Sequence, residues 1–537
     1  MSDSYVNLDG LIPREDFEAK PDQPSAANLP ATQTITELET GKFFYSVLKK
    51  PDFQRETANW DPETVAELIR SFVNDDLVPA IILWRSPSND VFVIDGSHRL
   101  SSLIAWVQDD YGDGDNSREF FEHSIPQAQL DAAEKTRKII NREVGSYSDL
   151  KFAISNPQKA LKPEHIDRAK KLGSLAINVQ WVNGDATKAE HSFFKINQQG
   201  TVIDPTELSM LKARMSPNAL AARAIIRAGV GHKYWSKFST ETQAEIETEA
   251  KNVYDNLFRP QLQTPIKTTD IPIAGRAYSA QTLPLIFDLV NLANDTVVGR
   301  VTQEVPKDPD GSKTIAFLRK VRQVAYRISG THPSSLGLHP VVYFYGASGR
   351  FQPTSFFGVV ALVKRLDSTD SFAEFTRVRQ HFENFLLEHK YLSNQITQKY
   401  GSGLKGYAKV VQLYELLLAH LQGGVIAKEQ LEKAITTNQE LSFLRFVPDY
   451  EDEATRKNFT TDIKSSTFLS EAVASLLHCK ICGAYMHRNS ITFDHIKDKK
   501  DGGAGDQSNA QIAHPYCNST YKDLQVKIAG SGPPSLS

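Results

Sequence analysis

Cysteine is scarce in this sequence: the 537 residues include only three, and all of them lie after residue 478. So few cysteines, confined to one segment, argue against a disulfide framework and favour a reducing compartment. Long apolar runs are also missing, because the longest, Phe356 to Val363, is far shorter than the ~20 residues that span a membrane. We therefore expect a cytoplasmic protein without a membrane partner.

An excess of charge of one sign is absent as well. The 61 Lys and Arg residues nearly balance the 64 Asp and Glu residues, which leaves a net charge of −3. This balance excludes a protein that coats nucleic acid along its whole length, so any affinity for DNA must come from local patches. The first residues, Met1 to Val6, also lack the charged-then-apolar pattern of a secretion signal.

The length predicts three or four domains of about 150 residues each. Residues 1–36 are polar and rich in Pro, Asp and Ala, and we expect a flexible N-terminal arm there. We expect a mixed α/β domain over 37–212, a helical linker or sensor region over 213–460, a metal-held domain over 461–529 and a flexible tail over 530–537. The predicted fold class is therefore α+β and multidomain.

Hydrophobic periodicity predicts the main elements. Asp61 and Pro62 have the residue types of an N-cap and first turn, and a 3.6-residue apolar stripe follows them. Short apolar runs bounded by turn residues predict buried strands at Ala80–Trp84, Val91–Ile94 and Ala176–Val182. Helical stripes of the later region lie at Leu283–Leu292, Thr314–Ile328 and Val410–Leu421.

What the cysteines do have is metal-ligand spacing. Cys479 and Cys482 form a C-x-x-C pair, and His514 and Cys517 form an H-x-x-C pair further on. Two such knuckles supply four ligands for one tetrahedral structural zinc ion. A unit this small has almost no core of its own, so the metal would supply its folding energy.

Polar residues with nuclease chemistry lie between and beside these knuckles. His495 is a candidate general base that activates water. Asp494 and Asn518 offer oxygen ligands for a catalytic divalent ion, Mg²⁺ or Mn²⁺. Asn509 could brace the loop that holds His495. Positive residues suited to phosphates gather here, although each alone could be a solvated surface residue; they are His487, Arg488, Lys497, Lys499, Lys500, Lys522 and Lys527.

These residues resemble the HNH endonuclease family and its ββα-metal fold, in which Asp-His is followed by a central Asn and a final His or Asn. The resemblance covers about 45 residues. It implies His495 as general base, Asp494 and Asn518 as catalytic metal ligands, and Asn509 as the structural Asn. Two positions depart from the commonest pattern, since His514 stands where Cys is commoner and Asn518 where many members have His. The alternative is a zinc ribbon that binds DNA or protein without cutting.

A second group of motifs lies in the N-terminal half. Asp95-Gly96-Ser97-His98-Arg99 joins a predicted strand to a helix start, where backbone N–H groups and an arginine fork attract phosphate. Gln54-Arg55 precedes it, and a segment containing Asn197 and Gly200 follows it. By themselves these residues also fit a purely structural interpretation, with Asp95 capping the helix, Arg99 in an ion pair and Gln54-Arg55 in a buried polar network.

In this order, the three segments resemble the N-terminal domain of GmrSD-type and SspE-type restriction proteins, of the ParB/sulfiredoxin-like superfamily. The resemblance spans about residues 40–212. It implies binding of a nucleoside triphosphate (NTP), with NTP hydrolysis as a further expected activity. The residues that it implies are Gln54, Arg55, Asp95, Gly96, His98, Arg99, Asn197 and Gly200, and Ser97 of the same turn completes the expected nucleotide site. Ser97 departs from the usual Gln. No cysteine lies nearby, which excludes sulfiredoxin chemistry.

Together the two resemblances imply a DNA endonuclease of a restriction or phage-defence type that is regulated by binding or hydrolysis of a nucleotide. Dependence on DNA modification is a further expectation. The expected partners are DNA, foreign or modified, and an NTP, while the oligomeric state stays open. The competing interpretation is a nucleotide-responsive DNA-binding regulator with a non-catalytic zinc finger. A homing-type nuclease is the third interpretation, and the large N-terminal nucleotide module argues against it.

Overall fold

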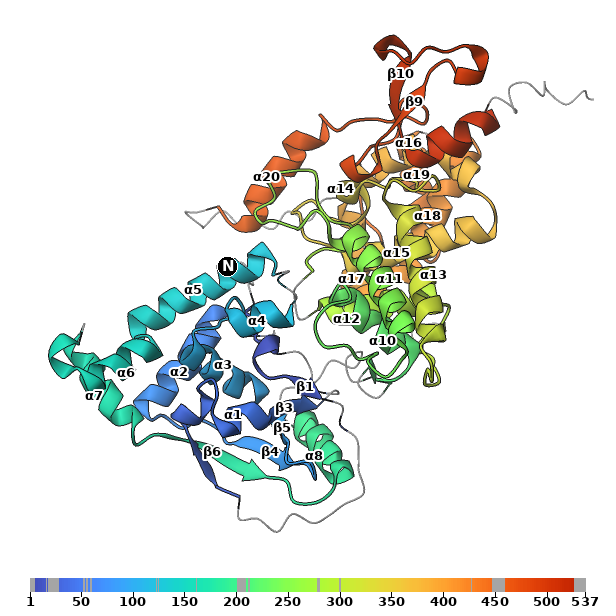
Figure 1. The fold of residues 1–537 in the computed structure, drawn as a ribbon. Helices are drawn as coiled ribbons and strands as arrows, with labels where there is room; N and C mark the ends of the chain where they lie inside the picture. The colour runs from blue at the N-terminus through green and yellow to red at the C-terminus, as the bar shows by residue number, and fades with distance from the viewer. Residues whose placement is uncertain are drawn as a thin grey trace, which may run out of the picture.

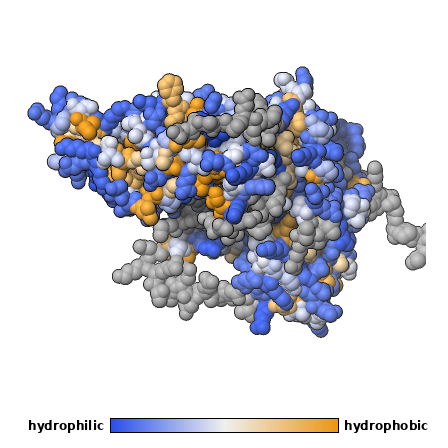
Figure 2. Space-filling model, turned by 90° about the horizontal axis from the view of Figure 1, so that it is seen from below, coloured by the Kyte–Doolittle hydropathy of each residue, from blue (hydrophilic) through white to orange (hydrophobic). Residues whose placement is uncertain are grey.

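The computed structural model joins an α/β N-terminal module to a helical region that carries a small C-terminal unit (Figure 1). The residues that the structure describes are 5–15, 17, 29–51, 54, 57, 60–121, 123, 125–160, 162–199, 209–210, 213–277, 281–298, 301–425, 427–446 and 459–525. The expected tail over 530–537 lies outside them. None of the helices in these ranges is both long and apolar enough to cross a membrane. On the face seen in Figure 2, hydrophilic residues predominate, with smaller hydrophobic groups between them.

A six-stranded mixed sheet organises the N-terminal module. In spatial order its strands are β1 (Arg14–Glu15), β3 (Leu48–Pro51), β5 (Val91–Asp95), β4 (Ile81–Arg85), β6 (Ala176–Trp181) and β2 (Thr32–Thr34). The pairs β1–β3, β3–β5 and β4–β6 are parallel, whereas β4–β5 and β2–β6 are antiparallel. The three strands predicted from apolar runs are confirmed, within one residue at each end.

Helices cover both faces of this sheet (Figure 1). They are α1 (Phe43–Val47), α2 (Pro62–Asn74), α3 (Ser97–Gln108), α4 (Asp115–Phe120), α5 (Gln127–Glu143), α6 (Tyr147–Ser155), α7 (Pro163–Leu172) and α8 (Ala186–Gln199). The described part of the N-terminal module has two hydrophobic cores, one on each face of the sheet. Because side chains alternate along a strand, Val91 and Val93 face the larger of these two cores, whereas Phe92 and Ile94 pack in the smaller one with Phe193 of α8. Asp61 caps α2 as predicted, accepting a hydrogen bond from the backbone of Thr64 at 2.8 Å.

The expectation of a flexible arm over 1–36 is wrong for the part that the structure describes. Val6, Leu8 and Leu11 are buried in the larger core. Further along, β1 and β2 occupy the two edges of the sheet, so backbone pairing and a few apolar anchors order a segment whose composition is polar. Residues 1–4, 16 and 18–28 lie outside the described residues.

The region after residue 212 is helical, which confirms the predicted stripes. Its helices are α10 (Pro217–Ile226), α11 (Thr240–Phe258), α12 (Thr282–Ala293), α13 (Ser312–Ile328), α14 (Pro340–Tyr343), α15 (Pro353–Ser368), α16 (Phe372–Glu388), α17 (Tyr391–Tyr400), α18 (Tyr407–Gln422) and α19 (Lys428–Thr437). A short hairpin interrupts them, made of β7 (Val297–Val298) and β8 (Val301–Thr302).

The C-terminal unit packs directly on these helices. It contains α20 (Thr461–Val473), the antiparallel hairpin of β9 (Thr492–His495) and β10 (Ala510–Ala513), and a π-helical turn, Cys517–Tyr521. Met486, Tyr516 and Tyr521 belong to the same hydrophobic core as the helices from α10 to α19. The C-terminal unit therefore shares its core with the helical region, and the N-terminal module has cores of its own.

One buried charge cluster connects the N-terminal module to the helical region. The Asp9 carboxylate contacts Arg14 at 2.7 Å, Lys50 at 3.0 Å and Arg227, which follows α10, at 3.0 Å. Although burial alone would raise the pKa of Asp9, the three positive charges hold it well below its usual value. The Arg227 guanidinium also lies 5.7 Å from the ring centre of Phe120 in α4.

Candidate functional site

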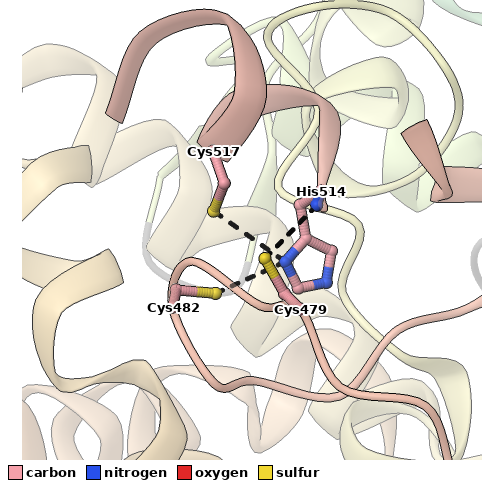
Figure 3. A group of neighbouring side chains, drawn as sticks. All are labelled: Cys479, Cys482, His514 and Cys517. Atoms are coloured by element: carbon pink, nitrogen blue, oxygen red, sulfur yellow. Dashed lines mark hydrogen bonds between the residues drawn. The ribbon is translucent and has the colours of Figure 1, made fainter. Parts of the chain in front are cut away.

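The four predicted zinc ligands converge on one point (Figure 3). The ligand atoms of Cys479, Cys482, His514 and Cys517 all lie within 4.8 Å of one another. His514 is fully buried, and its Nδ1 atom lies 3.4 Å from the sulfur of Cys482 and 3.9 Å from that of Cys517. Three thiols and one imidazole at this spacing fit a tetrahedral metal ion, and their chemistry is that of a zinc site.

Backbone hydrogen bonds shape both knuckles. In the first, the Gly483 N–H donates to the Cys479 carbonyl at 2.9 Å, and Gly483 has a φ of +72°, which few other residues adopt. In the second, the Asn518 N–H donates to the His514 carbonyl at 3.0 Å, so His514 and Cys517 lie on one helical turn. The His514 N–H also points at the Cys479 sulfur, 3.4 Å away. Local turns therefore orient the ligands.

A hydrogen bond fixes which nitrogen of His514 faces the sulfurs. Its Nε2–H donates to the carbonyl of Tyr485 at 3.0 Å, which leaves Nδ1 as the ligand atom. Burial is the main reason that the pKa of His514 is lowered, so its imidazole is neutral as metal binding requires. The residues present therefore fit a structural metal ion.

The helical region supports this metal cluster through a buried ion pair. Glu383 in α16 accepts the Tyr485 N–H at 2.8 Å and pairs with Arg379 at 2.6 Å. Arg379 in turn donates to the carbonyls of Leu336 and Gly337, the latter at 3.1 Å. The backbone of Tyr485 thus connects the two: its carbonyl accepts a hydrogen bond from His514, and its N–H donates one to Glu383.

The hairpin of β9 and β10 carries the candidate nuclease residues. In its register, Asp494 lies opposite Gln511 and His495 lies opposite Ala510. Asn509 binds the loop after His495, because its Oδ1 accepts the Lys497 N–H at 2.7 Å and its Nδ2 donates to the Lys497 carbonyl at 3.0 Å. This is the bracing contact expected of Asn509.

Asn518, in the π-helical turn Cys517–Tyr521, connects this turn to the same hairpin. Its Nδ2 donates to the Phe493 carbonyl at 3.1 Å, one residue before Asp494. Since this bond uses the amide nitrogen, the Oδ1 atom is the end of the side chain available to a cation. Asp494, His495 and Asn518 therefore belong to one strand–helix unit.

A lysine contacts the Asp494 carboxylate. Asp494 is 5% exposed, and both of its oxygens lie 3.2 Å from the Lys522 ammonium. Lys522 also contacts Asp498 at 2.8 Å, while Gln511 donates to Asp494 at 2.7 Å. Burial opposes the charge on Lys522, but the bonds to Asp498 and Asp494 raise its pKa, so it is cationic at neutral pH.

The expected patch of positive charge is smaller than its residue types suggest. His487 is buried, and burial lowers its pKa to about 4, so it is neutral near pH 7. Arg488 lies near Asp270, and Lys500 near Asp498. Lys497 and Lys499 are exposed, as phosphate contacts require. Lys527 lies outside the described residues.

The N-terminal motif forms the predicted strand–turn–helix. Gly96 has a φ of +87° and directly precedes α3, and a Cβ there would lie 2.7 Å from Ile81. Arg99 donates to Asp95 at 2.9 Å and to the Ala80 carbonyl at 3.1 Å. Arg99 therefore makes the structural ion pair considered as the alternative. Its guanidinium already donates to two protein oxygens, which leaves fewer N–H groups for a phosphate.

The other nucleotide candidates are only partly described. Ser97 is buried at the first turn of α3, and the ring of His98 lies 5.4 Å from that of Trp60. Gln54 is 4% exposed, and within the described part of the chain its Oε1 has no hydrogen-bond partner. Asn197 lies in α8 one helical turn after Phe193, and its side chain is outside the described residues, as is Arg55.

Sequence reasoning missed three groups that surround these sites. The sequence predicts Lys522 only as a phosphate contact, although Lys522 lies four residues after Asn518, the spacing of one helical face. Asp498 and Gln511 carried no motif signal. Glu383 and Tyr485 are 102 residues apart, and nothing in the sequence connects them.

Two family models match the chain. The description of the first is "GmrSD restriction endonuclease, N-terminal domain", and it matches residues 35–215. The second is "HNH endonuclease", and it matches residues 479–524, which include both knuckles, the hairpin and Asn518. No curated protein and no solved structure matches the chain.

Proposed function

Starting from the GmrSD-type restriction architecture of this chain, with a GmrSD N-terminal domain and an HNH endonuclease domain in one polypeptide, we propose that His495 is the general base of DNA cleavage. The two domains support a restriction-type DNA endonuclease. The observation that supports the residue assignment is the single unit built by β9, its braced loop and the following helix, which carries Asp494, His495, Asn509 and Asn518.

In this proposal the imidazole of His495 accepts a proton from the water that attacks the scissile phosphorus. Asp494 and the Oδ1 atom of Asn518 hold the catalytic divalent ion, Mg²⁺ or Mn²⁺. When bound, such an ion stabilises charge on the phosphate and on the leaving oxygen. Asn509 keeps the loop after His495 in place through its two bonds to Lys497. The Cys₃His cluster, with zinc as its ion, fixes the helix that carries Asn518.

The N-terminal module binds a nucleoside triphosphate in this proposal, and nucleotide state controls access to the nuclease. The turn from Asp95 to Arg99 receives the phosphates at the start of α3, with Gly96 allowing close backbone approach. Release of inorganic phosphate measures hydrolysis of this nucleotide, and cleavage of modified against unmodified DNA measures dependence on modification. The biological role is defence against foreign DNA in the cytoplasm.

Replacing His495 by Ala is expected to slow DNA cleavage at least about 100-fold, because general-base catalysis contributes that much or more. The assay follows cleavage of modified and unmodified phage DNA with Mg²⁺ or Mn²⁺, with and without nucleotide. EDTA should abolish cleavage. His332→Ala, which changes an exposed histidine of the helical region, is the control and should cut like wild type.

Equal cleavage by the His495 variant and wild type would refute the assignment of the base. A wild-type protein that binds DNA but cuts none of these substrates would instead support the competing interpretation, a nucleotide-responsive DNA-binding regulator.

Replacing Arg99 by Ala is expected to weaken nucleotide binding about tenfold or more, because a charge-assisted hydrogen bond contributes roughly 1.5–3 kcal/mol. Calorimetric titration with a panel of nucleotides measures the change. Arg70→Ala is the matched control, since Arg70 pairs with Glu143 on the surface of the same module. If both variants bind nucleotide like wild type, the site is not at this turn.

A further inference from the structure

The Lys522 ammonium lies where oxygen donors of the nuclease hairpin converge. It contacts both Asp494 oxygens at 3.2 Å, Asp498 at 2.8 Å and the backbone carbonyl of His495. Its side chain is 18% exposed and that of Asp494 is 5% exposed, so the pair is largely withdrawn from water. Two carboxylates and a carbonyl are oxygen ligands of the kind that divalent cations prefer, and in this structure the Lys522 ammonium occupies their centre.

A rare backbone feature places this lysine. The Lys522 N–H donates to the carbonyl of Cys517, five residues earlier, which closes the π-helical turn Cys517–Tyr521. Such a turn is an extra residue in a helix, and it rotates the following side chains relative to a regular helix. Because Cys517 is one of the four metal-cluster residues, the register of Lys522 against β9 is set by that cluster.

We propose that Lys522 is a tethered cation that neutralises Asp494 and Asp498 in the resting nuclease and leaves them when a divalent ion binds. This inference rests on the proposed function, and it makes Lys522 a positioning residue that sets the metal requirement of the site. The reason is electrostatic: an ammonium and a divalent ion repel each other strongly when both lie within a few ångströms of one buried carboxylate. Binding of the metal must therefore break the contacts of Lys522.

The test is a titration of zinc-loaded protein with Mn²⁺, in which electron paramagnetic resonance measures the free ion without any DNA. Lys522→Met should bind Mn²⁺ about fivefold more tightly than wild type, a difference of about 1 kcal/mol, since the ammonium no longer competes for Asp494. Asp494→Asn should lose this binding. Lys499→Met removes a positive charge from the same loop but none of these contacts, and should bind Mn²⁺ like wild type.

Unchanged Mn²⁺ binding by Lys522→Met would overturn the proposal, and weaker binding would overturn it by showing that the lysine instead orients Asp494 for the metal. The zinc content of each variant separates these outcomes from a loss of folding. The result is also independent of the proposed nuclease function, because the titration needs no cleavage. A protein that never cuts DNA can still show the shift, and an active nuclease can fail to show it.

Discussion

Loss of the ion from the Cys₃His cluster is expected to abolish DNA cleavage and to unfold residues 477–525. Structural zinc sites in small fingers contribute about 10 kcal/mol or more of folding free energy. Without an ion, three thiols and a buried imidazole would be held within 4.8 Å of one another with nothing to bind. Asn518 and Lys522, which follow the second knuckle directly, would lose their positions.

His514→Ala tests this expectation, with His478→Ala as its control. His478 lies beside the first knuckle, but its ring nitrogen contacts the Gly483 carbonyl rather than the cluster. Metal content, hydrogen exchange of residues 477–525 and thiol titration report the change. Because the chain has only three cysteines, thiols that react before chelation would show a vacant cluster directly. A His514 variant that retains its zinc would contradict the assignment of the fourth ligand.

Asp9→Ala is expected to destabilise the protein by about 3–5 kcal/mol, because it leaves the buried charges of Arg14, Lys50 and Arg227 without this carboxylate. The pKa of Asp9 is lower in the folded protein than in the unfolded chain. Its contribution is therefore complete above pH of about 4, and it is lost as the pH falls through the lowered value.

Urea unfolding followed at several pH values measures this effect. The control is Glu134→Ala, which removes a carboxylate from an exposed ion pair with Lys138 on α5 and should cost no more than about 0.5 kcal/mol. Equal midpoints for the two variants would show that the Asp9 cluster does not stabilise the junction between the modules.

The parts of the fold that could be predicted are those fixed by residues close together in sequence. The strand at Val91, the cap at Asp61 and the metal knuckles each depend on a few neighbours, and their residue types leave few alternatives. The structural interpretation of the turn is correct only in part: Arg99 is in an ion pair, but its partner is Asp95 at the end of β5, and no side chain caps α3.

The features that escaped prediction depend on contacts between distant segments. Asp9 meets Arg227 across 218 residues, and Lys522 meets Asp494 across 28. The composition of the N-terminal segment is polar and predicts disorder, yet pairing at the sheet edges and the buried side chains of Val6, Leu8 and Leu11 order its described part. Burial also cancelled the expected charge of His487, which the residue type alone could not reveal.

The helices α10–α19 and the metal-held unit share one hydrophobic core, so we expect them to move together as one rigid body. Cutting the chain near residue 460 would leave Met486, Tyr516 and Tyr521 facing water, so the shortest transplantable nuclease begins near residue 213. For the same reason, a displacement that delivers His495 to a phosphate would carry every helix of that body with it. Such a displacement would also strain the contacts of Arg227 with Asp9 and Phe120 of the N-terminal module.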